Sequence, residues 1–279
     1  MPTAHLPTGI DLYYESHGDG EPLVLLPSTA FPADVWLPDQ VPALSQVMRL
    51  IILDVRGVGR STHYQGAYTI EQMACDVIAL LDHLDVPAAH LLGHSMGGRF
   101  ALEAALDWPE RVKSLILAAS GSGPAGRAGP ECLPGLSYRV SSGLARLGFD
   151  EYVREEIVDS PVYFTDRYRA SHPDRVKAFF EQYVWPHHAR LPEYVRLVMA
   201  RQYWEATHRL GDVTVPTLVV VGTEDVGGSN HVAQGKLMAE RIPGAQYKEL
   251  PGQSHGYFWE APEETNALIR DWVLGHRAS

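Results

Sequence analysis

The sequence predicts an α/β fold with a mostly parallel central sheet, helices on its flanks and an inserted helical segment. Three observations support this prediction. Short apolar runs alternate with helical patterns from about residue 50 onward, as expected for a parallel sheet. The strand-like runs are continuously apolar, which is typical of a sheet buried on both faces. Between residues 121 and 212 the alternation stops and only helical periodicity remains.

The predicted elements follow in order along the chain. Residues 9–15 alternate apolar and polar side chains and indicate a strand, and the runs at 22–27 and 49–55 indicate buried strands. Thr69 and Gln72 have the spacing of a capping box, so a helix should begin there and end before Pro87. The later predicted elements are strands leading into Gly93 and at 114–119, 217–221 and 246–250, and helices through 100–105, 232–241 and 265–274.

Two sequence segments should make up the core domain, residues 1–120 and 213–279, with residues 121–212 as the insertion. The insertion is rich in aromatic side chains, including Tyr163 and Trp185. These side chains either line an apolar pocket or pack the insertion on the core.

Composition excludes several classes of partner. The chain has 279 residues, 45% of them hydrophobic, which is enough for a sizeable core. A formal charge of −11 argues against a nucleic-acid surface. No apolar stretch approaches the roughly 20 residues that span a bilayer, and the first residues lack the pattern of a secretory signal. We therefore expect a cytoplasmic protein that binds neither nucleic acid nor membrane; a homodimer stays open.

A Gly-x-Ser-x-Gly motif at residues 93–97 links a predicted strand to a predicted helix. This is the spacing of a nucleophile elbow, in which a sharp turn exposes the serine oxygen and small neighbours make room for it. Ser95 is therefore the candidate nucleophile. The backbone N–H of Met96, the residue after it, is the first candidate donor to an oxyanion, and the second should come from the loop at residues 27–32.

A serine nucleophile needs a base and an acid, and reactive groups of a parallel sheet follow the carboxyl ends of strands. Among the thirteen histidines, His255 lies just beyond the last predicted strand. Asp225 follows the strand at 217–221 and is preferred over Glu224 as the acid, while residues 120–122 contain no acidic side chain. Ser95, Asp225 and His255 thus stand in the order nucleophile, acid, base.

Two other motifs have competing interpretations. The glycines at positions 57 and 59 suggest a phosphate loop, but Thr62 stands where a nucleotide-binding fingerprint needs its third glycine. His187 and His188 are adjacent, so on a helix they point to different faces and are not expected to bind a metal.

Taken together, these motifs resemble the α/β-hydrolase family over nearly the whole chain, in particular its cofactor-free esterases and lactonases. Residues 93–98 resemble the family's elbow, 54–61 its Asp-x-Arg-Gly-x-Gly-x-Ser turn, and 222–225 and 252–255 its acid and base loops. The resemblance makes residues 121–212 a cap over the pocket and implies neither cofactor nor metal.

The chain departs from the family at Pro27 and Ser28, where most members carry His-Gly. By alignment Thr29 supplies the second oxyanion N–H, and the hydroxyls of Ser28 or Thr29 are further candidates. The predicted substrate-binding residues are two from this loop and two from the cap, namely Ser28, Ala30, Tyr163 and Trp185.

The leading hypothesis is hydrolysis of a carboxylic ester or lactone of a small, partly apolar substrate through Ser95, His255 and Asp225. A serine nucleophile argues against the dehalogenase and epoxide hydrolase branches, which resemble this scaffold but use aspartate. Two alternatives stay open: C–C bond hydrolysis of a ring-fission or β-diketone-like substrate, and a binding protein that holds a small ligand without turnover.

Overall fold

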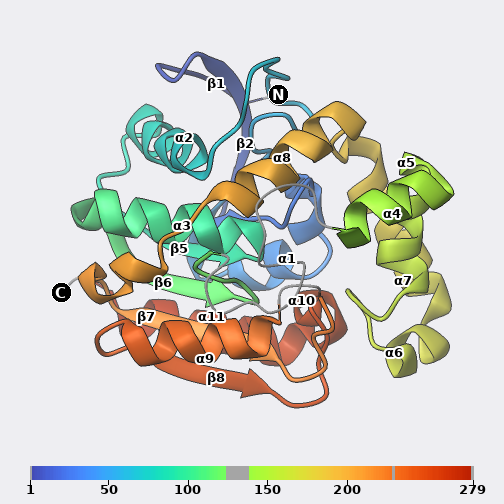
Figure 1. Cartoon of the computed structure of the whole chain (residues 1–279). Coiled ribbons are helices and arrows are strands. Elements are labelled where there is room, and N and C mark those ends of the chain that lie inside the picture. The colour runs from blue at the N-terminus through green and yellow to red at the C-terminus, as the bar shows by residue number, and fades with distance from the viewer. Residues whose placement is uncertain (1, 124–137, 228–229, 278–279) are drawn as a thin grey trace.

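An eight-stranded sheet forms the centre of the molecule (Figure 1). The computed structural model describes residues 2–123, 138–227 and 230–277. The strand order is β1-β2-β4-β3-β5-β6-β7-β8, with antiparallel pairing up to β4 and parallel pairing beyond it. The predicted mostly parallel sheet is confirmed. The strands are β1 (Thr3–Leu6), β2 (Ile10–His17), β3 (Glu21–Leu26), β4 (Met48–Leu53), β5 (Ala89–His94), β6 (Val112–Ala118), β7 (Thr217–Gly222) and β8 (Gln246–Leu250).

Helices cover both faces of the sheet (Figure 1). On one face α2 and α3 pack against each other beside α9, and α1 and α11 lie together on the other. The predicted capping box is present, since Thr69 Oγ1 accepts from the Gln72 N–H and Gln72 Oε1 accepts from the Thr69 N–H. The elements are η1 (Ala33–Trp36), α1 (Gln40–Leu44), α2 (Ile70–His83), α3 (Met96–Asp107), η2 (Pro109–Arg111), α9 (His231–Arg241), α10 (Tyr257–Glu260) and α11 (Pro262–Gly275).

Between β6 and β7 the described residues of the insertion form helices and turns, as predicted (Figure 1). Residues 124–137 of this segment lie outside the described residues. Within the described ranges, no helix has the length and apolar character needed to cross a membrane. The elements are α4 (Tyr138–Leu147), α5 (Phe149–Arg154), the π-helical η4 (Glu155–Asp159), α6 (Asp166–Ser171), α7 (Pro173–Phe179), the π-helical η5 (Phe180–Val184), η6 (Trp185–His187), α8 (Leu191–Tyr203) and η7 (Thr207–Asp212).

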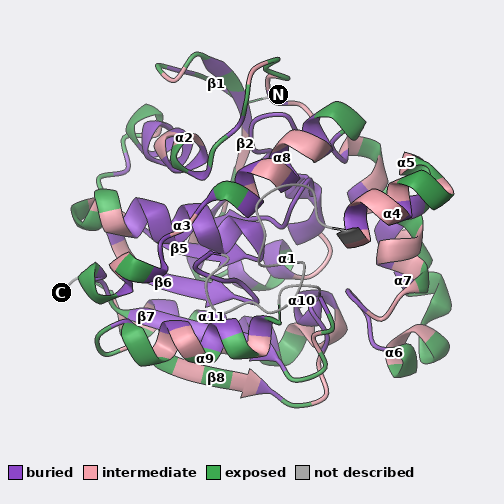
Figure 2. Ribbon diagram, in the orientation of Figure 1, coloured by how far each residue is buried: buried purple, intermediate pink, exposed green. Residues whose placement is uncertain are grey.

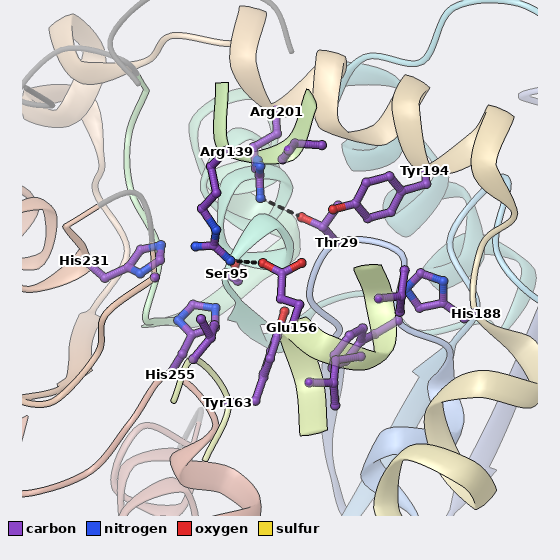
Figure 3. A pocket seen from close by; sticks show the side chains of 16 residues that line it. Thr29, Ser95, Arg139, Glu156, Tyr163, His188, Tyr194, Arg201, His231 and His255 are labelled. Carbon is purple, nitrogen blue, oxygen red and sulfur yellow. Dashed lines mark hydrogen bonds and ion pairs between the residues drawn. The ribbon is translucent and has the colours of Figure 1, made fainter. Parts of the chain in front are cut away.

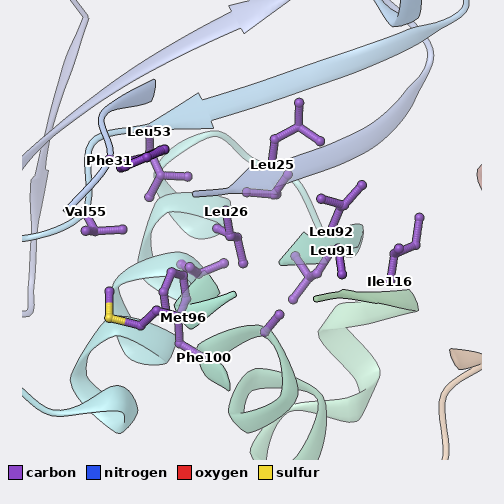
Figure 4. Close-up of a cluster of buried hydrophobic side chains, with 14 of the residues drawn as sticks. Leu25, Leu26, Phe31, Leu53, Val55, Leu91, Leu92, Met96, Phe100 and Ile116 are labelled. Carbon is purple, nitrogen blue, oxygen red and sulfur yellow. The ribbon is translucent and has the colours of Figure 1, made fainter. Parts of the chain in front are cut away.

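The hydrophobic core lies between the central strands and the helices (Figures 2 and 4). Leu25 of β3 is in register with Leu92 of β5, and both are fully buried. Met96 and Phe100 of α3 are equally buried in the same cluster. Burying a side chain of this size contributes about 1.5–3 kcal/mol, so packing fixes the start of α3 at the carboxyl end of β5.

A buried aspartate ties the loop after β3 to the turn after β4. Asp54 accepts from the Ala33 N–H at 2.7 Å, and from the N–H and Nε of Arg60 at 3.0 and 2.7 Å. Gly59 has φ +53°, and a β-carbon on it would lie 2.4 Å from Asp54 Oδ2. The turn that suggested a phosphate loop is therefore filled by the carboxylate of Asp54, which anchors the loop containing Thr29.

Candidate active site

Ser95 stands on a sharp turn between β5 and α3. Its backbone has φ 56° and ψ −114°, a strained conformation for a residue with a side chain. The turn is held by the Ser95 N–H, which donates to Ala118 O at 2.8 Å. A β-carbon on Gly93 would lie 2.4 Å from the backbone of Gly97, and one on Gly97 would lie 2.3 Å from Leu26 O. Close packing therefore requires both glycines of the motif.

His255 and Asp225 lie on the loops that follow β8 and β7. His255 Nδ1 is 2.7 Å from Asp225 Oδ2, while Asp225 Oδ1 accepts from the Gly227 N–H at 2.8 Å. Burial alone would raise the pKa of Asp225, but the facing rings of His231 and His255 hold that pKa well below its ordinary value. Asp225 is therefore ionised, whereas Glu224 is exposed and does not contact His255 in the described residues.

Two further histidines flank His255. The ring of His231 stacks on it at 4.5 Å, and His231 Nδ1 lies 3.0 Å from Asp225 Oδ2 without the alignment of a hydrogen bond. The ring of His94 lies 4.7 Å from His255, and His94 Nε2 donates to His255 O at 2.9 Å. Burial lowers the pKa of His231 and lowers that of His94 well below the ordinary value. Sequence reasoning missed His231, although it too follows β7.

Contacts with the insertion hold the loop that carries His255. The His255 N–H donates to Val162 O at 3.0 Å, and Ser254 Oγ donates to Tyr163 O at 2.8 Å. Glu260 accepts from the N–H groups of Ser254 and Thr165 at 3.0 and 2.8 Å. The position of the imidazole therefore depends on residues 162–165.

A small cavity of about 60 Å³ lies against Ser95 (Figure 3). Ser95, His255, Thr29 and Tyr163 line it together. Met96 is fully buried at the first position of α3, where a helix leaves its N–H without an intrahelical partner. The candidate nucleophile, base and oxyanion loop thus meet at one space.

The other predicted substrate-binding residues lie outside the cavity lining. Ser28 is buried behind Tyr163, with 3.2 Å between their hydroxyl oxygens. Ala30 is buried with φ 66°, and its carbonyl accepts from the Ala189 N–H. Trp185 is half-buried and stacks on His188, which does line the cavity.

Charged side chains of the insertion also reach the cavity, and sequence reasoning missed them. Arg139, Glu156 and Arg201 line its wall (Figure 3). Arg139 and Glu156 form an ion pair, and Arg201 Nη1 donates to Thr29 Oγ1 at 3.2 Å. Their signal in the sequence was weak, because a charged residue in an amphipathic helix ordinarily marks the solvent face.

One group of side chains among the described residues has the geometry to hold a metal ion. Asp225, His231 and His255 offer ligand atoms within 4.8 Å of one another. The hydrogen bond between Asp225 and His255 already uses two of these atoms. His187 and His188 are directed to different partners, Asp34 Oδ2 and the Ala189 carbonyl, as expected for adjacent residues.

The fold and the site define a class: an α/β protein whose candidate site lies at the carboxyl ends of its parallel strands. The family model for the α/β hydrolase fold matches residues 21–262. The chain therefore belongs to the α/β hydrolase fold family and is a hydrolase.

Comparison with known proteins finds relatives of nearly equal length. A relative named carbamate hydrolase RutD, from Azorhizobium caulinodans, is 30% identical over 96% of this chain and 97% of its own. The enol-lactonase from Burkholderia xenovorans LB400 superposes with a TM-score of 0.83 at 28% identity, covering 98% of this chain and 100% of its own. Est816, described as an N-acyl homoserine lactone degrading enzyme, has a TM-score of 0.77 at 30% identity and covers 97% and 100%.

Proposed function

We propose that this protein is a serine hydrolase that cleaves a carboxylic ester or lactone of a small, partly apolar substrate. The observation that carries the proposal is the hydrogen bond of His255 Nδ1 to the buried, ionised carboxylate of Asp225, beside Ser95 at one cavity. The names of the two lactone-degrading relatives favour an acyl carbon bonded to oxygen.

In the proposed mechanism Ser95 Oγ attacks the carbonyl carbon, and His255 Nε2 takes the serine proton and returns it to the leaving alkoxide. Asp225 holds His255 through Nδ1 and stabilises its charged form. The N–H groups of Met96 and Thr29 donate to the oxyanion; losing one such donor costs roughly 3 kcal/mol of transition-state stabilisation. Water, deprotonated by His255, then attacks the acyl-enzyme and releases the acid.

Residues 121–212 act as a cap in this proposal. Tyr163 joins the cap to the active site twice, because its ring lines the cavity and its carbonyl holds the His255 loop through Ser254. The Ser28 hydroxyl holds that of Tyr163, whereas Ala30 and Trp185 do not line the cavity: Ala30 O accepts from the Ala189 N–H, and Trp185 stacks on His188.

A substrate panel tests the proposal. Purified protein and its Ser95→Ala variant are assayed with p-nitrophenyl esters, lactones, a carbamate and a ring-fission dienoate. We expect Ser95-dependent turnover of esters or lactones. Turnover of the dienoate alone would favour C–C hydrolysis, turnover of the carbamate alone would favour a carbamate hydrolase, and tight ligand binding without product would favour a binding protein.

A further inference from the structure

Two arginines line the cavity beside Ser95, and they differ in their partners (Figure 3). Arg139 of α4 is paired with Glu156 of η4, so the charges of these two side chains cancel. Arg201 of α8 has no carboxylate within ion-pair distance in the described residues. The hydrogen bond that its guanidinium donates there goes to the neutral hydroxyl of Thr29, at 3.2 Å.

The surroundings of Arg201 leave part of its hydrogen-bonding capacity unused. Its Nε is buried without a hydrogen-bond partner. Burial raises the pKa of the phenols of Tyr163 and Tyr194 on the same wall, so both hydroxyls remain neutral. Asp225 is not part of the wall, because its carboxylate oxygens face the His255 ring and the Gly227 N–H. The described wall therefore carries one uncompensated positive charge.

We propose that Arg201 binds a carboxylate on the substrate, so that the substrate class is a small ester or lactone that also bears one negative charge. This inference rests on the proposed function of the same site. A guanidinium presents paired N–H donors that match a carboxylate, and a partly buried cation without a counter-ion favours an anionic ligand. The single uncompensated charge favours a monoanion over a neutral ester.

A purely structural role is the competing explanation, because Arg201 also holds the Thr29 side chain. That role would act on every substrate through the oxyanion loop. Charge recognition would act only on the substrate that carries the anion. The ratio of kcat/KM for a charged ester to that for its neutral counterpart therefore separates the two explanations.

The test compares monomethyl glutarate with dimethyl glutarate at pH 8, where histidine is ordinarily neutral. We expect wild type to prefer the monoanion at least tenfold in kcat/KM, and Arg201→Gln to lower that ratio tenfold or more, mainly through KM. Thr29→Val removes only the hydroxyl that Arg201 contacts and should leave the ratio at least as high as in wild type. Glu156→Gln frees Arg139 and should raise the ratio.

A binding measurement separates this inference from the proposed function. Glutarate is titrated into Ser95→Ala and into Ser95→Ala with Arg201→Gln, and we expect the second change to weaken binding at least tenfold. Equal glutarate binding by the two proteins overturns the carboxylate subsite. So does a fall in kcat/KM that is the same for the charged and the neutral ester in both Arg201→Gln and Thr29→Val. If neither ester is hydrolysed but glutarate binding depends on Arg201, the subsite stands and ester hydrolysis fails.

Discussion

Replacing Asp225 by asparagine removes one charge and leaves the shape of the site almost unchanged. Asp225 Oδ1 accepts from the Gly227 N–H at 2.8 Å, so the amide oxygen of the asparagine should stay on that side. The amide NH₂ then faces His255 Nδ1, which in the parent protein lies 2.7 Å from Oδ2. To accept from this NH₂, the imidazole must carry its proton on Nε2, and a ring in that tautomer cannot take the proton of Ser95.

A wrong tautomer in a Ser-His-Asp site lowers kcat by roughly 10⁴, which corresponds to about 5.4 kcal/mol of transition-state stabilisation. We expect a loss of this size in Asp225→Asn, measured as kcat on the best ester of the panel. Thermal unfolding serves as the control for folding, and Glu224→Gln is the matched variant, because Glu224 is an exposed neighbour. An Asp225→Asn protein that folds and keeps a tenth of the parent kcat would show that Asp225 does not set the tautomer of His255.

Three further predictions concern stability. Burial lowers the pKa of His188 to about 4. As pH falls below about 6.5, this histidine is protonated in the unfolded chain but not in the folded protein. Its contribution to the free energy of unfolding is therefore complete above that pH, and about 2 kcal/mol is lost by pH 5. In urea unfolding His188→Gln should therefore lose about 2 kcal/mol less than wild type between pH 7.5 and 5, and equal losses would contradict this. Gly97→Ala suits a helix but meets Leu26 O, so its Tm should fall, with about 1–3 kcal/mol lost; an unchanged Tm would contradict the clash. Arg56→Met leaves Asp76 buried without its partner at 2.7 Å and should lower the free energy of unfolding in urea by about 3–5 kcal/mol. Adding Asp76→Leu should restore most of this stability. An Arg56→Met protein as stable as wild type would contradict a stabilising role of this ion pair.

The sheet and the turn that carries the candidate nucleophile could be predicted because their signals are local. Continuous apolar runs mark the buried strands, and the glycines around Ser95 are required by atoms within a few residues or on the next strand. The contact between the candidate residues Asp225 and His255 could be expected because the carboxyl ends of parallel strands share one edge. His231 follows the same strand, six residues after Asp225, so a search that continued this far along the chain would have included it.

The cavity wall could not be predicted because it depends on how the insertion packs. Arg139, Glu156 and Arg201 sit on three different elements, and no periodicity fixes which face of each element turns inward. Trp185 shows the same limit: it was predicted to bind substrate, whereas its ring stacks on His188 outside the cavity lining. The short β1 strand was also missed, since four residues give little alternation to detect.

Covalent labelling is the direct test of Ser95 as the nucleophile. The purified protein is treated with a fluorophosphonate, and its intact mass and peptide map are measured. We expect one added phosphonyl group, located on Ser95, and none on Ser95→Ala. Labelling of Ser95→Ala to the same extent, or a label on another residue of the wild-type protein, would contradict it.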